Sequence, residues 1–174
     1  RRLFEVLLKM YDAAIIDENL RLGTFLLAGV ARCPPTAERT SWLREALAET
    51  RLRQVAQNVA AGAHPDLPGL IAFFRAAGRS AVPIVLTVLP SFPEATDRRA
   101  LADLVLELGV HSVDLVRDLI HAEQAFLAQD GMYILSRLGT PEAKAALREA
   151  EYHPAAHIRI GLLENAKLLG EREG

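Results

Sequence analysis

The sequence is poor in cysteine and in aromatic residues. Cys33 is its only cysteine, so no disulfide can form within the chain, and a reducing compartment is favoured. Aromatic residues make up only 6% of the 174 residues, whereas alanine and leucine are abundant. Because alanine and leucine lose little entropy in a helix, this composition favours helices.

Long apolar runs and a strong charge of one sign are also missing. No run of about 18 apolar residues occurs, so we expect no insertion into a membrane. The first apolar stretch is interrupted by Glu5, Lys9 and Asp12, which does not fit a secretory signal and favours a cytoplasmic protein. The net charge is −2, from +2 over residues 1–62 and −4 over residues 63–174. We therefore expect no nucleic-acid partner.

Helical periodicity begins at the first residues, before which there is no initiating methionine, so we expect a piece of a longer protein. A second helix is predicted over 20–30, ended by Cys33-Pro34-Pro35, because proline has no amide hydrogen to donate. A third helical stretch runs from 36 to 61, with a break near Thr50. One apolar face of the first helix is expected to hold Leu3, Val6, Leu7, Met10 and Ala14.

A period of about 30 residues emerges in the second half. Helices are predicted to end at Gly78, Gly109, Gly139 and Gly170, at spacings of 31, 30 and 31 residues. Glycine suits the residue just past a helix, where the backbone often turns left-handed. The regular punctuation predicts a structural repeat.

Each predicted unit carries the same apolar columns on two helices, separated by turns at 92–94, 122–124 and 153–154. Ile84–Leu89 is the best strand candidate, but its place in the repeat favours helix. The first-helix columns are Val82, Val85 and Leu89; Val113, Val116 and Ile120; and Ala143, Ala146 and Ala150. The second-helix columns are Leu101, Leu104, Val105 and Leu108; Ile134, Leu135 and Leu138; and Leu162, Ala166 and Leu169.

A helix pair of this length cannot bury both apolar faces alone, so we expect the pairs to stack in series. The predicted fold is therefore all-α: an α-solenoid of antiparallel helix pairs. Residues 1–62 are expected to form N-terminal helices that pack on the array, within one continuous domain. Residues 63–174 are expected to hold repeat units near 79–109, 110–139 and 140–170.

Residues 65–170 resemble HEAT-repeat proteins, especially the short-unit bacterial kind. Arg98 and Arg159 match the basic residue that such units place early in the second helix, whereas Ala128 does not, and Asp130-Gly131 interrupts the middle unit. Stretches that carry the resemblance are Ser80–Leu86, Arg98–Gly109, Tyr133–Gly139, Thr140–Leu147, and His153-Pro154 with Ile158–Gly170. HEAT-like stacks include scaffolds, a few lyases and a few DNA-binding enzymes, so the resemblance specifies fold better than function.

Two groups of histidines deserve comparison with catalytic or metal sites. His153 and His157 lie four residues apart, which could place two metal ligands on one helix face, but the Pro154 turn favours a capping role. His111 and His121 flank a helix with Asp114 and Asp118; a histidine–carboxylate pair could exchange protons, yet solvated helix ends are the favoured interpretation.

The remaining reactive candidates favour structure over catalysis. Cys33 could be a nucleophile, but it follows the negative end of a helix, so a structural role is favoured. Arg39, Arg44, Arg51 and Arg53 are interleaved with Glu38, Glu45 and Glu49, a pattern typical of an exposed face with ion pairs. The sequence has no phosphate-binding loop, serine elbow or Cys/His cluster, so we expect no cofactor, no metal and no enzyme.

The expected function is a non-catalytic adaptor that binds a protein partner through the second helices of its units. Tyr133 is the leading candidate, because exposed aromatic residues are enriched at binding hot spots. The candidate binding residues are Arg99, Asp103, Tyr133, Ser136, Glu164 and Lys167. Alternatives are a HEAT-like lyase or ligand-binding protein, and a DNA-binding helical-repeat protein. An uncapped last unit predicts either more repeats in the full protein or self-association through residues 140–170.

Overall fold

A computed structural model describes residues 2–62, 66–110, 113–152, 155–156 and 158–163. Over these ranges the chain is helical and contains no strand, which confirms the all-α class. The chain divides into two compact units, Arg1–Ser91 and Phe92–Gly174. The boundary at 62/63 expected from the sequence falls inside the first unit, between its fourth and fifth helices.

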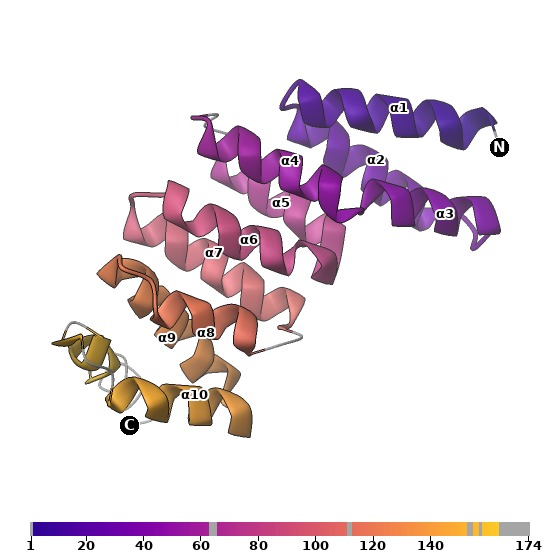
Figure 1. Ribbon diagram of the computed structural model, residues 1–174. Coiled ribbons are helices and arrows are strands. Elements are labelled where there is room, and N and C mark those ends of the chain that lie inside the picture. Colours follow the sequence, from indigo (N-terminus) through magenta and orange to yellow (C-terminus); the bar gives the residue numbers. More distant parts are fainter. Residues whose placement is uncertain (1, 63–65, 111–112, 153–154, 157, 164–174) are drawn as a thin grey trace. The chain divides into compact units, whose positions relative to one another are not determined.

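The first unit adds its helices in serial order (Figure 1). Its elements are α1 (Arg2–Ile16), α2 (Leu20–Arg32), α3 (Ala37–Ala46), α4 (Glu49–Ala60), α5 (Leu67–Ala77), the 3-10 turn η1 (Gly78–Ala81), α6 (Val82–Val88) and the 3-10 turn η2 (Leu89–Ser91). Helix α1 packs against α2, α3 and α4. Helix α4 in turn packs on α6, and α2 packs on α5.

Aromatic side chains fill the core of the first unit. The buried ring of Tyr11 meets Trp42 edge-on, with centroids 5.7 Å apart, and stacks on Phe73 at 6.4 Å. Gly23 on α2 makes room for this cluster, because a Cβ there would lie 3.2 Å from the Phe73 ring. An ion pair between Arg51 Nε and Asp12 Oδ1, at 2.5 Å, joins α4 to α1.

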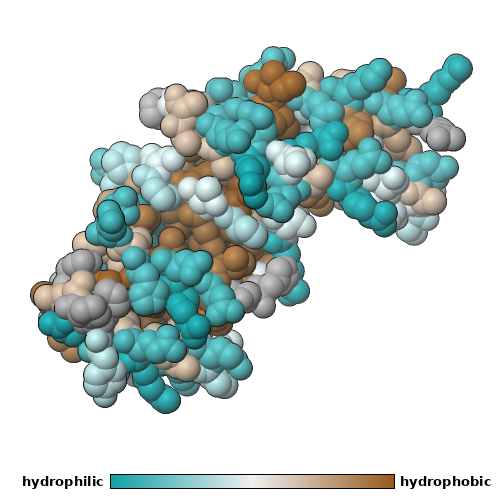
Figure 2. All heavy atoms as spheres, viewed as in Figure 1, coloured by the Kyte–Doolittle hydropathy of each residue, from teal (hydrophilic) through white to brown (hydrophobic). Residues whose placement is uncertain are grey.

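The apolar face predicted for the first helix is only partly buried. Ala14 is buried, but Leu3, Val6 and Met10 are exposed. The residues that α1 buries are Tyr11, Ala14 and Ile15. Hydrophobic residues reach the surface among hydrophilic ones on the face drawn in Figure 2. An apolar stripe in a sequence identifies an apolar face without showing whether another element covers it.

Local sequence explains most helix boundaries in the first unit. Thr36 caps α3 by accepting a hydrogen bond from the Arg39 amide, and Asp66 caps α5 by accepting one from Gly69. The predicted break in the 36–61 stretch is present, but at Leu47 and Ala48 rather than Thr50. Ala48 makes no side-chain capping bond.

One stretch of the described chain, Leu67–Ser91, is long and apolar enough to cross a membrane by length and composition. Half of its apolar window is buried inside the fold. Gly78, with φ of 68°, separates α5 from the turn before α6. The predictions on membrane insertion and on a cytoplasmic location stay predictions.

The second unit is arranged around α9 (Ala125–Leu138). This helix packs on α7 (Ala95–Leu108), on α8 (Asp114–Ile120) and on α10 (Pro141–Glu151). Residues 158–163 are helical as well. Helix α8 lies next to the predicted turn at 122–124, and α9 begins directly after that turn.

The predicted glycine ends are confirmed at the positions that the structure describes. Gly78, Gly109 and Gly139 follow α5, α7 and α9, with φ of 68°, 83° and 63°. Gly170 lies outside the described residues. The strand candidate Ile84–Leu89 is helical, as its place in the repeat suggested.

The predicted core columns are largely buried. Every first-helix column residue is buried except Val113, which is half-buried. Among the described second-helix residues, Leu108, Leu138 and Leu162 are half-buried and the others are buried. The columns therefore identify the core of these helices.

Candidate functional site

Four of the six predicted binding residues come together on α7 and α9 of the second unit. We call Arg99, Asp103, Tyr133 and Ser136 the α7–α9 cluster. Asp103 lies one turn after Arg99 on α7, so both can reach the same part of α9. Asp103 is exposed, and the other three side chains are half-buried. The remaining two candidates, Glu164 and Lys167, lie outside the described residues.

Tyr133 is the centre of this cluster. The guanidinium carbon of Arg99 lies 3.5 Å from the centroid of its ring, a cation–π contact. Its hydroxyl donates a hydrogen bond to Asp103 Oδ1 at 2.5 Å. Ser136 Oγ donates to the backbone carbonyl of Tyr133 at 2.8 Å. The phenol is therefore held in one position from both its face and its tip.

The electrostatics of the cluster keep the phenol neutral. Burial raises the pKa of Tyr133, and the hydrogen bond to Asp103 and the negative charge of that residue raise it further. The positive charge of Arg99 acts in the opposite direction. The cluster thus holds a neutral phenol, whose hydrogen is donated to Asp103, next to a carboxylate and a guanidinium.

Such an arrangement suits recognition of a polar protein surface. Asp103 keeps free acceptor positions, because a carboxylate has about four and Tyr133 occupies one. Tyrosine and arginine are enriched at binding hot spots. Side chains that are already ordered lose less entropy when a partner binds. The same contacts also hold α7 against α9, so the cluster has a structural role as well.

A buried ion pair beneath the cluster fixes α7 on α9. Arg98 and Asp130 are each 6% exposed, and Arg98 Nε donates to Asp130 Oδ2 at 2.7 Å. Arg98 Nη1 donates to the carbonyls of Phe92 and Pro93, at 3.1 and 2.7 Å. Its guanidinium also lies 4.4 Å from the ring centroid of Phe126. Burial raises the pKa of Asp130, and the guanidinium of Arg98 opposes that rise.

The Asp130-Gly131 pair, which weakens the repeat pattern of the middle unit, has a clear structural reason. Asp130 is the partner of Arg98, and Gly131 allows α9 to approach α8 closely. A Cβ at position 131 would lie 2.9 Å from Leu119 Cβ and 3.4 Å from the Val116 carbonyl oxygen. Sequence reasoning missed the ion pair. The available signal was that Arg98 and Asp130 stand at the spacing of the apolar columns, three before Leu101 and four before Ile134.

The predicted basic run in the first unit is partly paired with acidic residues. Arg53 forms an ion pair with Glu49, as expected. Arg51 instead reaches Asp12 on α1, and Arg39 donates to the carbonyls of Val30 and Ala31 at the end of α2. Arg51 and Arg39 therefore join two helices each, whereas the pair of Arg53 with Glu49 lies within α4.

The other reactive candidates are placed as follows. Cys33 is exposed at the C-cap of α2, and its Sγ donates to the Gly29 carbonyl at 3.6 Å. His121 is the C-cap of α8, and Asp114 on that helix pairs with Arg117 at 3.2 Å. His111, His153 and His157 lie outside the described residues. Within the described part, no three His, Cys, Asp or Glu side chains gather in a way that could hold a metal.

No family model, no curated protein and no solved structure matches this chain. The resemblance to HEAT repeats stays a prediction from the sequence.

Proposed function

We propose that this chain is a HEAT-like stack of helix pairs that binds a protein partner through the α7–α9 cluster. The stack is supported by the serial packing inside each unit: α1 to α4 to α6 in the first, and α7 to α9 in the second. It is also supported by the glycine helix ends, which recur at 31 and 30 residues. Both features are typical of solenoids, in which each repeat packs on its neighbours.

The observation that carries the binding function is the fixed position of Tyr133. Arg99 and Asp103, both on the preceding second helix, hold its ring and its hydroxyl. A surface side chain that is ordered by two neighbours offers a partner a rigid amphipathic anchor. In this proposal the module acts without a cofactor or a catalytic step, in the cytoplasm.

The proposal is tested by capture from an extract of the source organism. The immobilised chain is compared with the Arg99→Glu/Tyr133→Ala double variant and with Arg148→Glu, a charge reversal at an exposed position on α10. We expect a specific protein to bind the wild type and Arg148→Glu and to be lost from the double variant. Circular dichroism and thermal unfolding verify that each variant is folded.

The opposite pattern would refute the surface assignment. If a folded double variant captures every partner of the wild-type chain, the α7–α9 cluster is not the binding surface. If a partner is lost only from the Arg148→Glu variant, the binding surface lies on α10.

A further inference from the structure

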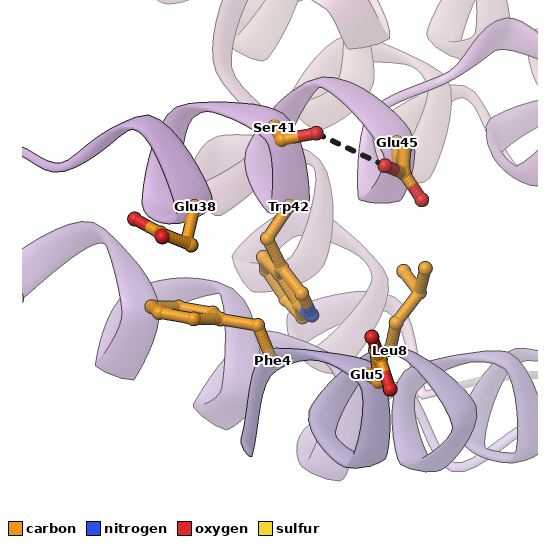
Figure 3. Close-up of a pocket in the computed structure, with 7 residues that line it drawn as sticks. All are labelled: Phe4, Glu5, Leu8, Glu38, Ser41, Trp42 and Glu45. Carbon is orange, nitrogen blue, oxygen red and sulfur yellow. Dashed lines mark hydrogen bonds between the residues drawn. The ribbon is translucent and has the colours of Figure 1, made fainter. Parts of the chain in front are cut away.

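We propose that a cleft between α1 and α3 of the first unit binds an arginine side chain of a protein partner (Figure 3). This cleft shares no residue with the α7–α9 cluster, and the inference does not depend on that cluster. Its volume is about 240 Å³. The residues that line it are Phe4, Glu5, Leu8, Glu38, Ser41, Trp42 and Glu45.

The size of the cleft favours one long side chain over a whole cofactor. Sites for drug-sized ligands typically measure roughly 300–1,000 Å³. The cleft lies below that range. A cleft of this volume suits one extended arginine side chain.

The charge of the cleft calls for a cation. Its lining holds three glutamates and no basic residue. The exposed carboxylate of Glu38 makes no ion pair with another described residue. The carboxylate of Glu45 accepts a hydrogen bond from Ser41 Oγ at 3.1 Å and lies within the field of Arg51. A lining of carboxylates and aromatic rings matches a guanidinium, which binds a carboxylate through two N–H groups and stacks on rings.

Trp42 adds a second, independent sign of a missing ligand group. Its side chain is only 2% exposed, and its Nε1 has no hydrogen-bond partner among the described residues. Figure 3 shows the indole between Phe4 and Leu8, with the nitrogen turned toward α1. A buried donor without an acceptor is costly, and an acceptor inserted into the cleft would relieve that cost.

The glutamate lining and the unpartnered Trp42 Nε1 together indicate a peptide. An arginine residue within a chain carries both a guanidinium for the glutamates and a nearby backbone carbonyl that can accept from Trp42 Nε1. A polyamine supplies the positive charge but no hydrogen-bond acceptor, so it would leave Trp42 Nε1 without a partner. The occupant we infer is therefore an arginine in an exposed segment of a partner protein.

Intrinsic fluorescence tests this inference directly, because Trp42 is the only tryptophan of the chain. The full chain is titrated with acetyl-Gly-Arg-Gly-amide, with the same peptide carrying neutral citrulline, and with spermidine. We expect a saturable change in tryptophan emission with the arginine peptide, and little change with the other two. Added salt is expected to weaken the response, because the cleft is open to solvent.

A matched pair of variants assigns the binding to the glutamates. Glu38→Gln/Glu45→Gln keeps side-chain size and is expected to weaken binding of the arginine peptide by roughly threefold to tenfold, the range for partly exposed charge pairs. Glu123→Gln, at an exposed position in the second unit, is expected to leave it unchanged. Equal binding of the arginine and citrulline peptides, or unchanged affinity in the folded double variant, would overturn the proposal. An equal response to spermidine would also overturn it, in favour of a polyamine.

Discussion

At the scale of single residues, the charges of the second unit form two layers. Arg98 and Asp130 are buried together, whereas Arg99 and Asp103 lie next to them on the surface and hold Tyr133. The buried layer fixes the register of α7 on α9. The surface layer uses that register, since Asp103 meets the Tyr133 hydroxyl only if the two helices are aligned.

The buried pair predicts a large loss of stability when one partner is removed. Asp130→Ala leaves the guanidinium of Arg98 buried without a counter-charge, so we expect the free energy of unfolding to fall by about 3–5 kcal/mol. Urea denaturation measures the change. Arg53→Ala is the control, because its ion pair with Glu49 is mostly exposed; we expect a change of at most about 1 kcal/mol. Equal small effects in both variants would show that Arg98 and Asp130 do not act as a buried pair.

The surface layer predicts how Tyr133 titrates. Its pKa lies above the usual value of 10.0, and Asp103→Asn is expected to lower it, because the carboxylate is one cause of the rise. Since the folded-state pKa is raised, this group's contribution to stability is fully present below the unfolded pKa and is lost as the pH rises through the folded pKa. The difference in ultraviolet absorbance between each protein and its Tyr133→Phe counterpart gives the midpoint. A midpoint that does not respond to Asp103→Asn would contradict the hydrogen bond.

At the scale of helices, close packing between α8 and α9 depends on Gly131. A Cβ there would lie 2.9 Å from Leu119 Cβ, so Gly131→Ala forces the helices apart. We expect a loss of about 1–3 kcal/mol in the free energy of unfolding, despite the better helix propensity of alanine. Thermal and urea unfolding of the variant measure this.

Gly29 on α2 is the matched control for that substitution. Nothing lies within 4 Å of the position that its Cβ would take. Gly29→Ala is therefore expected to raise the free energy of unfolding by about 0.5–1 kcal/mol, because alanine is the better helix former. If both substitutions stabilise the protein, α9 does not approach α8 as closely as described.

Helix ends show how far local sequence can predict structure here. The glycine ends of α5, α7 and α9 can be predicted from the sequence because glycine adopts a positive φ at little cost. The break between α3 and α4 has no such marker, since Ala48 lacks a capping side chain. It lies at Leu47 and Ala48, before the predicted position near Thr50. The contact of Arg98 with Asp130 and the cleft between α1 and α3 required knowledge of which helices meet. Such long-range pairing is not encoded within any single segment.

At the scale of the whole molecule, exposed apolar side chains occur in the stretch for which self-association is predicted. Tyr152 is 85% exposed and Leu163 is 70% exposed, and both lie within the stretch 140–170 for which self-association is predicted. We expect the mass measured by light scattering to rise above 19.0 kDa with concentration, and Leu163→Asp to abolish the rise. Leu115→Asp on α8 is the control. A monomer at every concentration would contradict self-association through this surface.

The central claim is that the α7–α9 cluster contacts a protein partner. Replacing Ser136 with benzoylphenylalanine puts a photoreactive group beside Tyr133 while Arg99 and Asp103 stay intact, and the same replacement at Arg148 serves as the comparison. After illumination in an extract of the source organism, we predict that one partner is joined to the chain at position 136 and not at position 148. Joining of the same proteins at both positions, or only at 148, would contradict the claim.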